Sequence, residues 1–260
     1  MSSICFCRSS ELRTVGHVPD TAFANPRLAA LYDTFEGDRG DLDAYAAIAA
    51  EVHARRVLDI GCGTGTFAVL LASRGLEVTA VDPALASVEI ARRKSSANLV
   101  RWLHGDATDL PALQVDLATM TGNVAHAIVD PERWRATLHG IHDALRPDGH
   151  LVFETRNPAV QAWRDWTRSN TQQVIDVEGA GPVEKWVELT DISLPLVSFR
   201  ATYRFHREGV TLTSDSTLRF RERDEIEADL VAAGYRLRDV RDAPDRPGRE
   251  LVFVTQRPAS

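Results

Sequence analysis

The sequence predicts an α/β fold in which a parallel sheet is interrupted by a separate β-rich segment. Three observations support this expectation. Short apolar runs, typical of buried parallel strands, alternate with segments of helical period between residues 57 and 155. The first run ends in a loop with glycine at every second position, which lets a ligand approach the backbone. Residues 173–220 show the period of two that is typical of antiparallel strands.

Composition and charge favour a small-molecule partner. The chain has 260 residues and a net charge of −7, and it has no basic run, so we expect no nucleic acid partner. No apolar run is long enough for a membrane helix, and the first residues lack a signal-peptide pattern. We therefore expect no membrane partner and a cytoplasmic protein. Cys5 and Cys7 are too close for an ordinary disulfide, and no His or Cys cluster predicts a metal site.

The N-terminal part is predicted to be a flexible arm followed by two helices. Residues 1–24 show neither helical nor strand period, so we expect an arm. Asn25 and Pro26 have the pattern of a helix cap and first turn, and apolar residues continue at helical spacing to Phe35. Asp41 begins a second helix.

The remaining chain divides into a core and an insertion. Strands are expected at residues 57–60, 77–81, 99–103, 115–120 and 150–155, with helices between them. Residues 157–220 are too long for a simple loop and are interpreted as a cap that binds substrate or forms a dimer interface. The core then resumes with a helix and two strands. The predicted layout is an arm at 1–24, a core at 25–156 and 221–257, and a cap at 157–220.

The glycine loop distinguishes between cofactor classes. Thr66 stands where the dinucleotide fingerprint G-x-G-x-x-G has its third glycine, and no Lys-Ser/Thr pair of a P-loop follows. The run V-L-D-I-G-C-G-T-G at 57–65 resembles the first motif of the class I S-adenosylmethionine-dependent methyltransferases. The resemblance covers about 40–156 and 220–257. It implies a Rossmann-like seven-stranded sheet with helices on both faces, an antiparallel last strand, and a β-rich cap inserted after the fifth strand.

The same resemblance implies roles in binding S-adenosyl-L-methionine. Asp59 would lie near the positively charged amino acid part of the cofactor. Asp82 follows the second strand, where such folds hold a ribose, although it also has the position of a helix cap before Pro83. Asp106 would contact the adenine, or simply occupy a surface turn. Tyr32 would close over the cofactor, or pack in the core. The predicted cofactor-binding set is Tyr32, Asp59, Gly61, Cys62, Gly63, Gly65, Asp82, Pro83, Asp106, Ala107 and Thr121.

Three residues are candidates for handling the methyl acceptor. His126 is a candidate general base because its ordinary pKa suits proton transfer, although packing histidines are common. Asn123 either orients the acceptor or caps a turn. Arg156, with Trp163 and Tyr203, either binds an anionic or aromatic acceptor or belongs to the core and cap packing.

The predicted function is methyl transfer from S-adenosylmethionine to a nitrogen or oxygen of a small molecule. An in-line displacement of an activated methyl group depends mainly on position and orientation. The chain lacks the Asn/Asp-Pro-Pro-aromatic motif of base-amino methyltransferases after the fourth strand, which again disfavours nucleic acid. Two alternatives stay open: a nucleotide-cofactor oxidoreductase of the same fold, and a non-catalytic S-adenosylmethionine-binding module. A homodimer formed through the cap is a further hypothesis.

Overall fold

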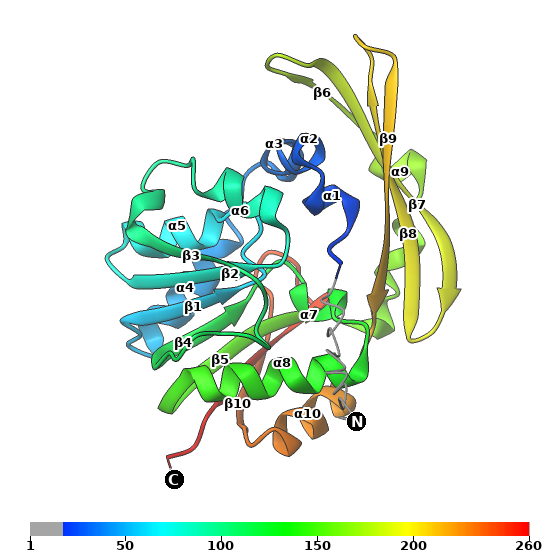
Figure 1. The fold of residues 1–260 in the computed structure, drawn as a ribbon. Helices are drawn as coiled ribbons and strands as arrows, with labels where there is room; N and C mark the ends of the chain where they lie inside the picture. The colour runs from blue at the N-terminus through cyan, green and yellow to red at the C-terminus, as the bar shows by residue number, and fades with distance from the viewer. Residues whose placement is uncertain (1–17, 260) are drawn as a thin grey trace, which may run out of the picture.

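The computed structural model describes residues 18–259, and within them two sheets stand apart from each other (Figure 1). The larger sheet has seven strands in the order β10-β11-β5-β4-β1-β2-β3. Strands β1 to β5 are mutually parallel, whereas β11 is antiparallel to both β5 and β10. This Rossmann-like layout confirms the predicted core sheet and its antiparallel last strand. The bounds are β1 (Arg56–Ile60), β2 (Glu77–Asp82), β3 (Val100–His104), β4 (Val115–Met120), β5 (Leu145–Arg156), β10 (Arg236–Asp242) and β11 (Glu250–Gln256).

Alternate residues of the central strands pack against helices on opposite faces of this sheet. Phe153 belongs to one apolar cluster with residues of α8 (Pro131–Ala144) and α10 (Arg223–Ala232). Its neighbour Val152 belongs to a second cluster with residues of α4 (Leu42–Glu51) and α5 (Thr66–Ser73). Because both faces are covered, β1, β2 and β4 are buried along almost their whole length instead of alternating between buried and exposed residues. The other core elements are α6 (Leu85–Ala91), η1 (Ala97–Leu99) and α7 (Val124–Ala127).

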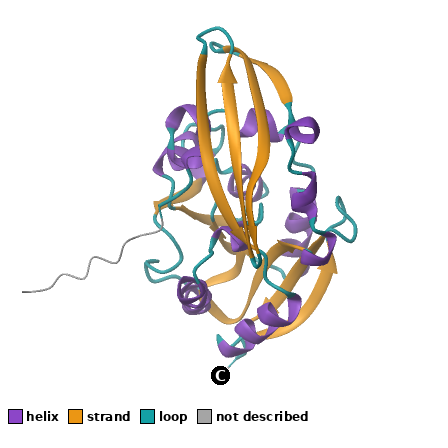
Figure 2. Ribbon diagram, turned by 90° about the vertical axis from the view of Figure 1, so that its right-hand side faces the viewer, coloured by secondary structure: helices purple, strands orange, loops and turns teal. Residues whose placement is uncertain are grey.

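The inserted segment forms the predicted cap, a four-stranded antiparallel sheet in the order β6-β7-β8-β9 (Figure 2). Its strands are β6 (Gln173–Val177), β7 (Gly181–Ser193), β8 (Leu196–Phe205) and β9 (Val210–Arg219). Three short helices connect it to β5: η2 (Pro158–Val160), η3 (Ala162–Asp165) and α9 (Arg168–Thr171).

The N-terminal helices lie between the core and the cap (Figure 1). The first predicted helix is divided into α2 (Pro26–Ala29) and α3 (Tyr32–Glu36), and the Asn25 side chain caps α2 as expected. The sequence predicted no helix before Ala24, whereas α1 (Thr21–Ala24) is helical, and its Ala22 N–H donates to Ser214 Oγ of β9 at 2.8 Å. Residues 1–17, with Cys5 and Cys7, lie outside the described residues. No described helix combines the length and apolarity needed to cross a membrane.

Candidate functional site

A cavity of about 760 Å³ lies where the core, the N-terminal helices and the cap meet. Its core wall comes from the carboxyl ends of β1, β2 and β4, the edge at which open α/β sheets bind ligands. Its opposite wall includes side chains of β7, β8 and β9. The cavity contains every sequence-predicted site residue except Gly65 and His126.

The three positions of the loop need glycine for different physical reasons. All three have positive φ, at +67° for Gly61, +52° for Gly63 and +80° for Gly65. A Cβ on Gly61 would lie 2.4 Å from Val124 Cγ2, and one on Gly65 would lie 2.4 Å from Trp102 Cη2. A Cβ on Gly63 would meet nothing within 4 Å, and this residue lines the cavity. Gly61 and Gly65 are therefore required by packing, while Gly63 leaves open space for a ligand.

Asp59 at the end of β1 has an unfilled hydrogen-bonding atom. The side chain is 1% exposed, and its Oδ1 accepts from Thr119 Oγ1 at 3.1 Å. Its buried Oδ2 has no hydrogen-bond partner among residues 18–259. Burial raises the pKa of Asp59 to about 7, because the ionised carboxylate has lost its hydration. A cationic group beside this carboxylate would restore the lost interactions, so the position fits the ammonium of the expected cofactor.

Asp82 holds the glycine loop against the end of β2. Its Oδ2 accepts from the Gly63 N–H at 2.8 Å and its Oδ1 from the Ala84 N–H at 2.7 Å. Burial also raises the pKa of Asp82. Each oxygen keeps further lone pairs, and the residue lines the cavity, so its position allows both the loop contact and the predicted ribose contact.

Asp106 has the turn geometry that the sequence left as an alternative. Its Oδ1 accepts from the Thr108 N–H at 2.8 Å, and its Oδ2 is paired with Arg133 of α8. The residue nevertheless lines the cavity together with Ala107. An adenine contact through this carboxylate would therefore share Oδ1 with Thr108 or Oδ2 with Arg133.

His126 is placed differently from its predicted role as a base. The residue is 1% exposed and is not among the cavity-lining residues. Its Nδ1 donates to the Arg219 carbonyl at 2.7 Å, and its Nε2 accepts from the Arg156 N–H at 2.7 Å. Burial lowers the pKa of His126 to about 3, so the ring is neutral near pH 7. This geometry argues against proton transfer to an acceptor and gives His126 a structural role.

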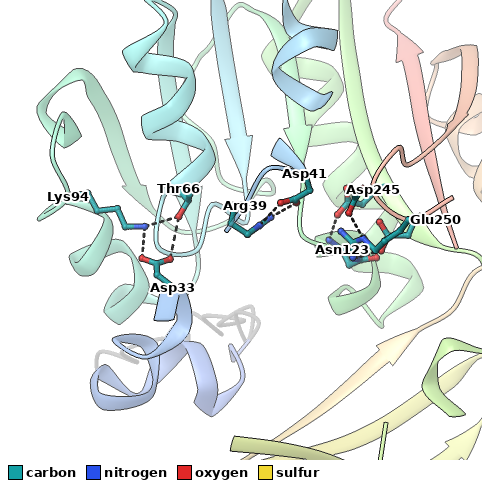
Figure 3. Close-up of polar contacts among 10 residues, drawn as sticks. Asp33, Arg39, Asp41, Thr66, Lys94, Asn123, Asp245 and Glu250 are labelled. Atoms are coloured by element: carbon teal, nitrogen blue, oxygen red, sulfur yellow. Dashed lines mark hydrogen bonds and ion pairs between the residues drawn. The ribbon is translucent and has the colours of Figure 1, made fainter. Parts of the chain in front are cut away.

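Asn123 and Arg156 both line the cavity, and each contacts a different set of residues. The Asn123 backbone N–H donates to Glu154 Oε1 at 2.9 Å, and its Nδ2 donates to Glu250 Oε1 at 3.2 Å (Figure 3). Asn123 is thus held in a left-handed conformation, with φ of +63°. Trp163, suggested beside Arg156, packs instead in a cap cluster with Val197 and Phe220.

Several polar residues of the cavity were missed by the sequence reasoning. Arg39 forms a two-bond pair with Asp41, with both distances 2.9 Å (Figure 3). Lys185 of β7 reaches Glu36 of α3 at 3.7 Å. These residues lie in a polar loop, at a helix end and on a strand with many charged neighbours, and so they carried no distinctive sequence signal.

Comparisons with known proteins agree with this fold. Residues 57–149 match the family model described as a methyltransferase domain. The cypemycin N-terminal methyltransferase of a Streptomyces species is 35% identical over 106 residues, which are 40% of this chain and 43% of that protein. A solved sugar N-methyltransferase from a Streptoalloteichus species is 18% identical, with a TM-score of 0.71 and full coverage of both chains. An amino pentose methyltransferase from Micromonospora echinaspora, solved with S-adenosylmethionine bound, is 21% identical, with a TM-score of 0.66 over 88% of this chain and 95% of that one.

The fold and the loop match define a Rossmann-like protein with a methyltransferase domain. Residues 57–149 carry a methyltransferase domain, which supports S-adenosyl-L-methionine as the cofactor. The first curated relatives match over less than half of their own length, from 43% to 49%. The activity and substrate of the whole protein are therefore matters of proposal.

Proposed function

We propose that the protein transfers a methyl group from S-adenosylmethionine to a nitrogen or oxygen of a small molecule. The observation that supports this most directly is the buried Oδ2 of Asp59, which has no partner among the described residues and lies beside a glycine loop, on the wall of a cavity shared with the cap. An acidic loop suits a cationic cofactor and disfavours a pyrophosphate. Solved neighbours named as sugar N- and amino pentose methyltransferases make an amine the first acceptor class to assay.

The chain's own residues would act mainly by binding and orientation. When bound, S-adenosylmethionine supplies a methyl group that is already activated for displacement. Asp59 would hold the ammonium, Asp82 the ribose hydroxyls, and Asp106 with Ala107 the adenine edge. The cap face and the N-terminal helices would exclude water and fix the acceptor. Such positioning can contribute about 7–11 kcal/mol to lowering a barrier. An amine that arrives unprotonated needs no base before attack.

Calorimetry with S-adenosylhomocysteine tests the cofactor site. We expect one binding site, and we expect Asp82→Ala to weaken binding by about 1.5–3 kcal/mol, the scale of hydrogen bonds to charged groups. Asp143→Ala removes an exposed carboxylate on α8 and should change nothing. Absence of binding heat with the unaltered protein would refute the proposal. Binding without transfer across a panel of amines and alcohols would favour a non-catalytic module.

The cap at 157–220 is proposed as the part that selects the acceptor, since its inner face lines the cavity. A homodimer through the cap is a separate proposal, supported by the long antiparallel strands that it presents. Sedimentation velocity would contradict it by showing only monomer at micromolar concentration.

A further inference from the structure

The cations that line the cavity differ in whether they have a partner. Four of them face a carboxylate: Arg39 with Asp41, Arg133 with Asp106, Lys185 with Glu36, and Arg246 with both Asp245 and Glu250. Arg156 is the exception, because its guanidinium makes no hydrogen bond or ion pair with any part of the chain that the structure describes. Its charged group is left facing the ring of Trp166, with 5.2 Å between Cζ and the ring centroid.

Arg156 is held in place by its backbone. It is the last residue of β5, and its N–H donates to His126 Nε2 at 2.7 Å. Glu250 lies opposite it on β11, but the Oε1 of Glu250 accepts from Asn123 and Arg246 instead. Burial lowers the pKa of Arg156, which reflects the cost of removing its charge from water. The structure thus fixes a half-buried cation whose guanidinium forms no direct pair with a carboxylate of the described residues, although the nearby Glu250 and Glu154 favour its charged form.

A guanidinium in this state has a clear chemical preference. It presents five N–H donors in a planar fork, which matches the oxygens of a carboxylate or a phosphate in a two-bond contact. A desolvated charge costs free energy until it is paired, so an anionic ligand would gain from binding here. Neither neighbouring carboxylate among the described residues provides that pairing: Glu250 contacts Asn123 and Arg246, and Glu154 contacts Asn123.

The wall of the cavity next to Arg156 is apolar and aromatic. Trp166 and Phe199 pack edge to face, with ring centroids 4.9 Å apart, and both line the cavity. Val187, Ala201 and Leu218 of the cap sheet extend the same surface. An acceptor with an apolar or aromatic body would contact this face of the cap.

We propose that the methyl acceptor carries an anionic group, a carboxylate or a phosphate ester, which Arg156 binds while an apolar body rests on the cap face. This inference rests on the proposed methyl transfer and names the substrate class of the same cavity. Arg156 is then a specificity-determining residue, and His126 is a positioning residue that holds its backbone. The nucleophilic nitrogen or oxygen would belong to another part of the same molecule.

Three small probes of similar shape test the inference: benzoate, phenyl phosphate and the neutral benzamide. Their affinities are measured by ligand-observed NMR, with and without saturating S-adenosylhomocysteine. We expect at least one anionic probe to bind about tenfold more tightly than benzamide or better, as expected for a charge-assisted contact. The Arg156→Gln variant should lose this preference while benzamide binding stays unchanged. The ranking of benzoate and phenyl phosphate identifies which anion the site prefers.

Two further variants make the outcome decisive. Arg200→Gln removes an exposed arginine that pairs with Asp215 on the outer face of the cap, and should leave all probe affinities unchanged. Arg156→Lys keeps the charge without the fork, and should show an intermediate preference even if Arg156→Gln folds poorly. Equal binding of all three probes by the unaltered protein would overturn the inference. So would a preference for anions that survives both changes at Arg156.

The test separates this inference from the proposed function. S-adenosylhomocysteine binding is measured first, by calorimetry. If it binds but no anionic probe is preferred, the inference fails and the proposed methyl transfer stands. If it does not bind, the proposed function fails, and the probe titrations without it still decide whether Arg156 is an anion site.

Discussion

His126 joins segments that are far apart in the chain. One ring nitrogen accepts from the Arg156 N–H at the end of β5, and the other donates to the Arg219 carbonyl at the end of β9. Arg219 is 93 residues away from His126 in the sequence. Asp59, equally buried, differs in having one oxygen without a partner in the part of the chain that the structure describes. A buried polar group that is fully hydrogen-bonded supports the fold, whereas one that lacks a protein partner needs a water, an ion or a ligand to complete its hydrogen bonds. The sequence placed Asp59 at a strand end and His126 in the segment after the fourth strand, but it could not show their partners, because these contacts form only in the folded chain.

Neutral His126 makes folding stability depend on pH. Its pKa is about 3 in the folded protein, against an ordinary value near 6.5, so the unfolded chain binds more protons between these values. The contribution is fully present above pH 6.5 and is lost as pH falls toward 3. Facing charges on Arg156 and Arg221 act in the same direction as burial.

We therefore expect the His126→Gln variant to be less stable than the unaltered protein at pH 7, with a gap that narrows as pH falls. Below about pH 6 the gap should shrink by about 1.4 kcal/mol per pH unit. Urea unfolding at pH 5, 6 and 7 measures it. His139→Gln, an exposed histidine on α8, is the control. A gap that stays constant with pH would show that His126 titrates normally in the folded state.

At the scale of elements, the alternation of apolar and polar residues predicted the strands of the cap but not which face of the cap sheet lines the cavity. On β7, Lys185 and Val187 line the cavity, while Trp186 lies on the other face between Arg168 and Arg204. Because each face carries aromatic residues with cationic neighbours, the period of two alone could not choose between them. The glycine loop was more informative, because the spacing of its glycines predicts both a turn with positive φ and a close approach of a ligand to the backbone.

Gly63, Gly65 and Gly75 all have positive φ, so alanine variants at these three positions separate the effect of packing on stability from the effect on ligand binding. Gly63→Ala should cost about 1–2 kcal/mol of stability for its left-handed backbone, and should weaken S-adenosylhomocysteine binding because the new methyl group enters the cavity wall. Gly65→Ala should cost about 1–3 kcal/mol more, since its Cβ meets Trp102 and Ala91. Gly75→Ala, with φ of +87° and nothing within 4 Å, is the matched control away from the cavity. Equal stability of the Gly63 and Gly65 variants in denaturant unfolding would contradict the packing argument.

At the scale of the whole molecule, the N-terminal helices connect the cap to the core around the cavity (Figure 1). Leu28, Leu31 and Phe35 form one apolar cluster with Val183 and Tyr203 of the cap. Contacts between segments about 150 residues apart left no local pattern, which is why the sequence predicted the helices but not their position. The core sheet was predictable because its strands and helices alternate along the chain.

A polar residue of α3, Asp33, also contacts the glycine loop and the residues that follow it. Asp33 of α3 pairs with Lys94 at 2.6 Å, and Lys94 donates to Thr66 Oγ1 at 2.8 Å (Figure 3). Asp33 also accepts from Thr64 Oγ1 at 2.6 Å. Thr64 and Thr66 line the cavity, so this contact lies close to the expected ligand. The ion pair is partly exposed, with 24% of the Lys94 and 41% of the Asp33 side chain accessible, and we expect it to contribute at most about 1 kcal/mol.

The Lys94→Met variant should therefore release S-adenosylhomocysteine faster, with an affinity loss of up to about fivefold and little change in melting temperature. The physical reason is that the helices above the loop would lose a polar attachment while keeping their apolar contacts to the cap. Stopped-flow displacement measures the dissociation rate, and Arg74→Met, which removes an exposed pair with Asp43, is the control. Identical dissociation rates for Lys94→Met, Arg74→Met and the unaltered protein would mean that α3 does not hold the ligand. A large fall in melting temperature would instead contradict the contribution of at most about 1 kcal/mol given to this partly exposed pair, and would show that the pair supports the fold.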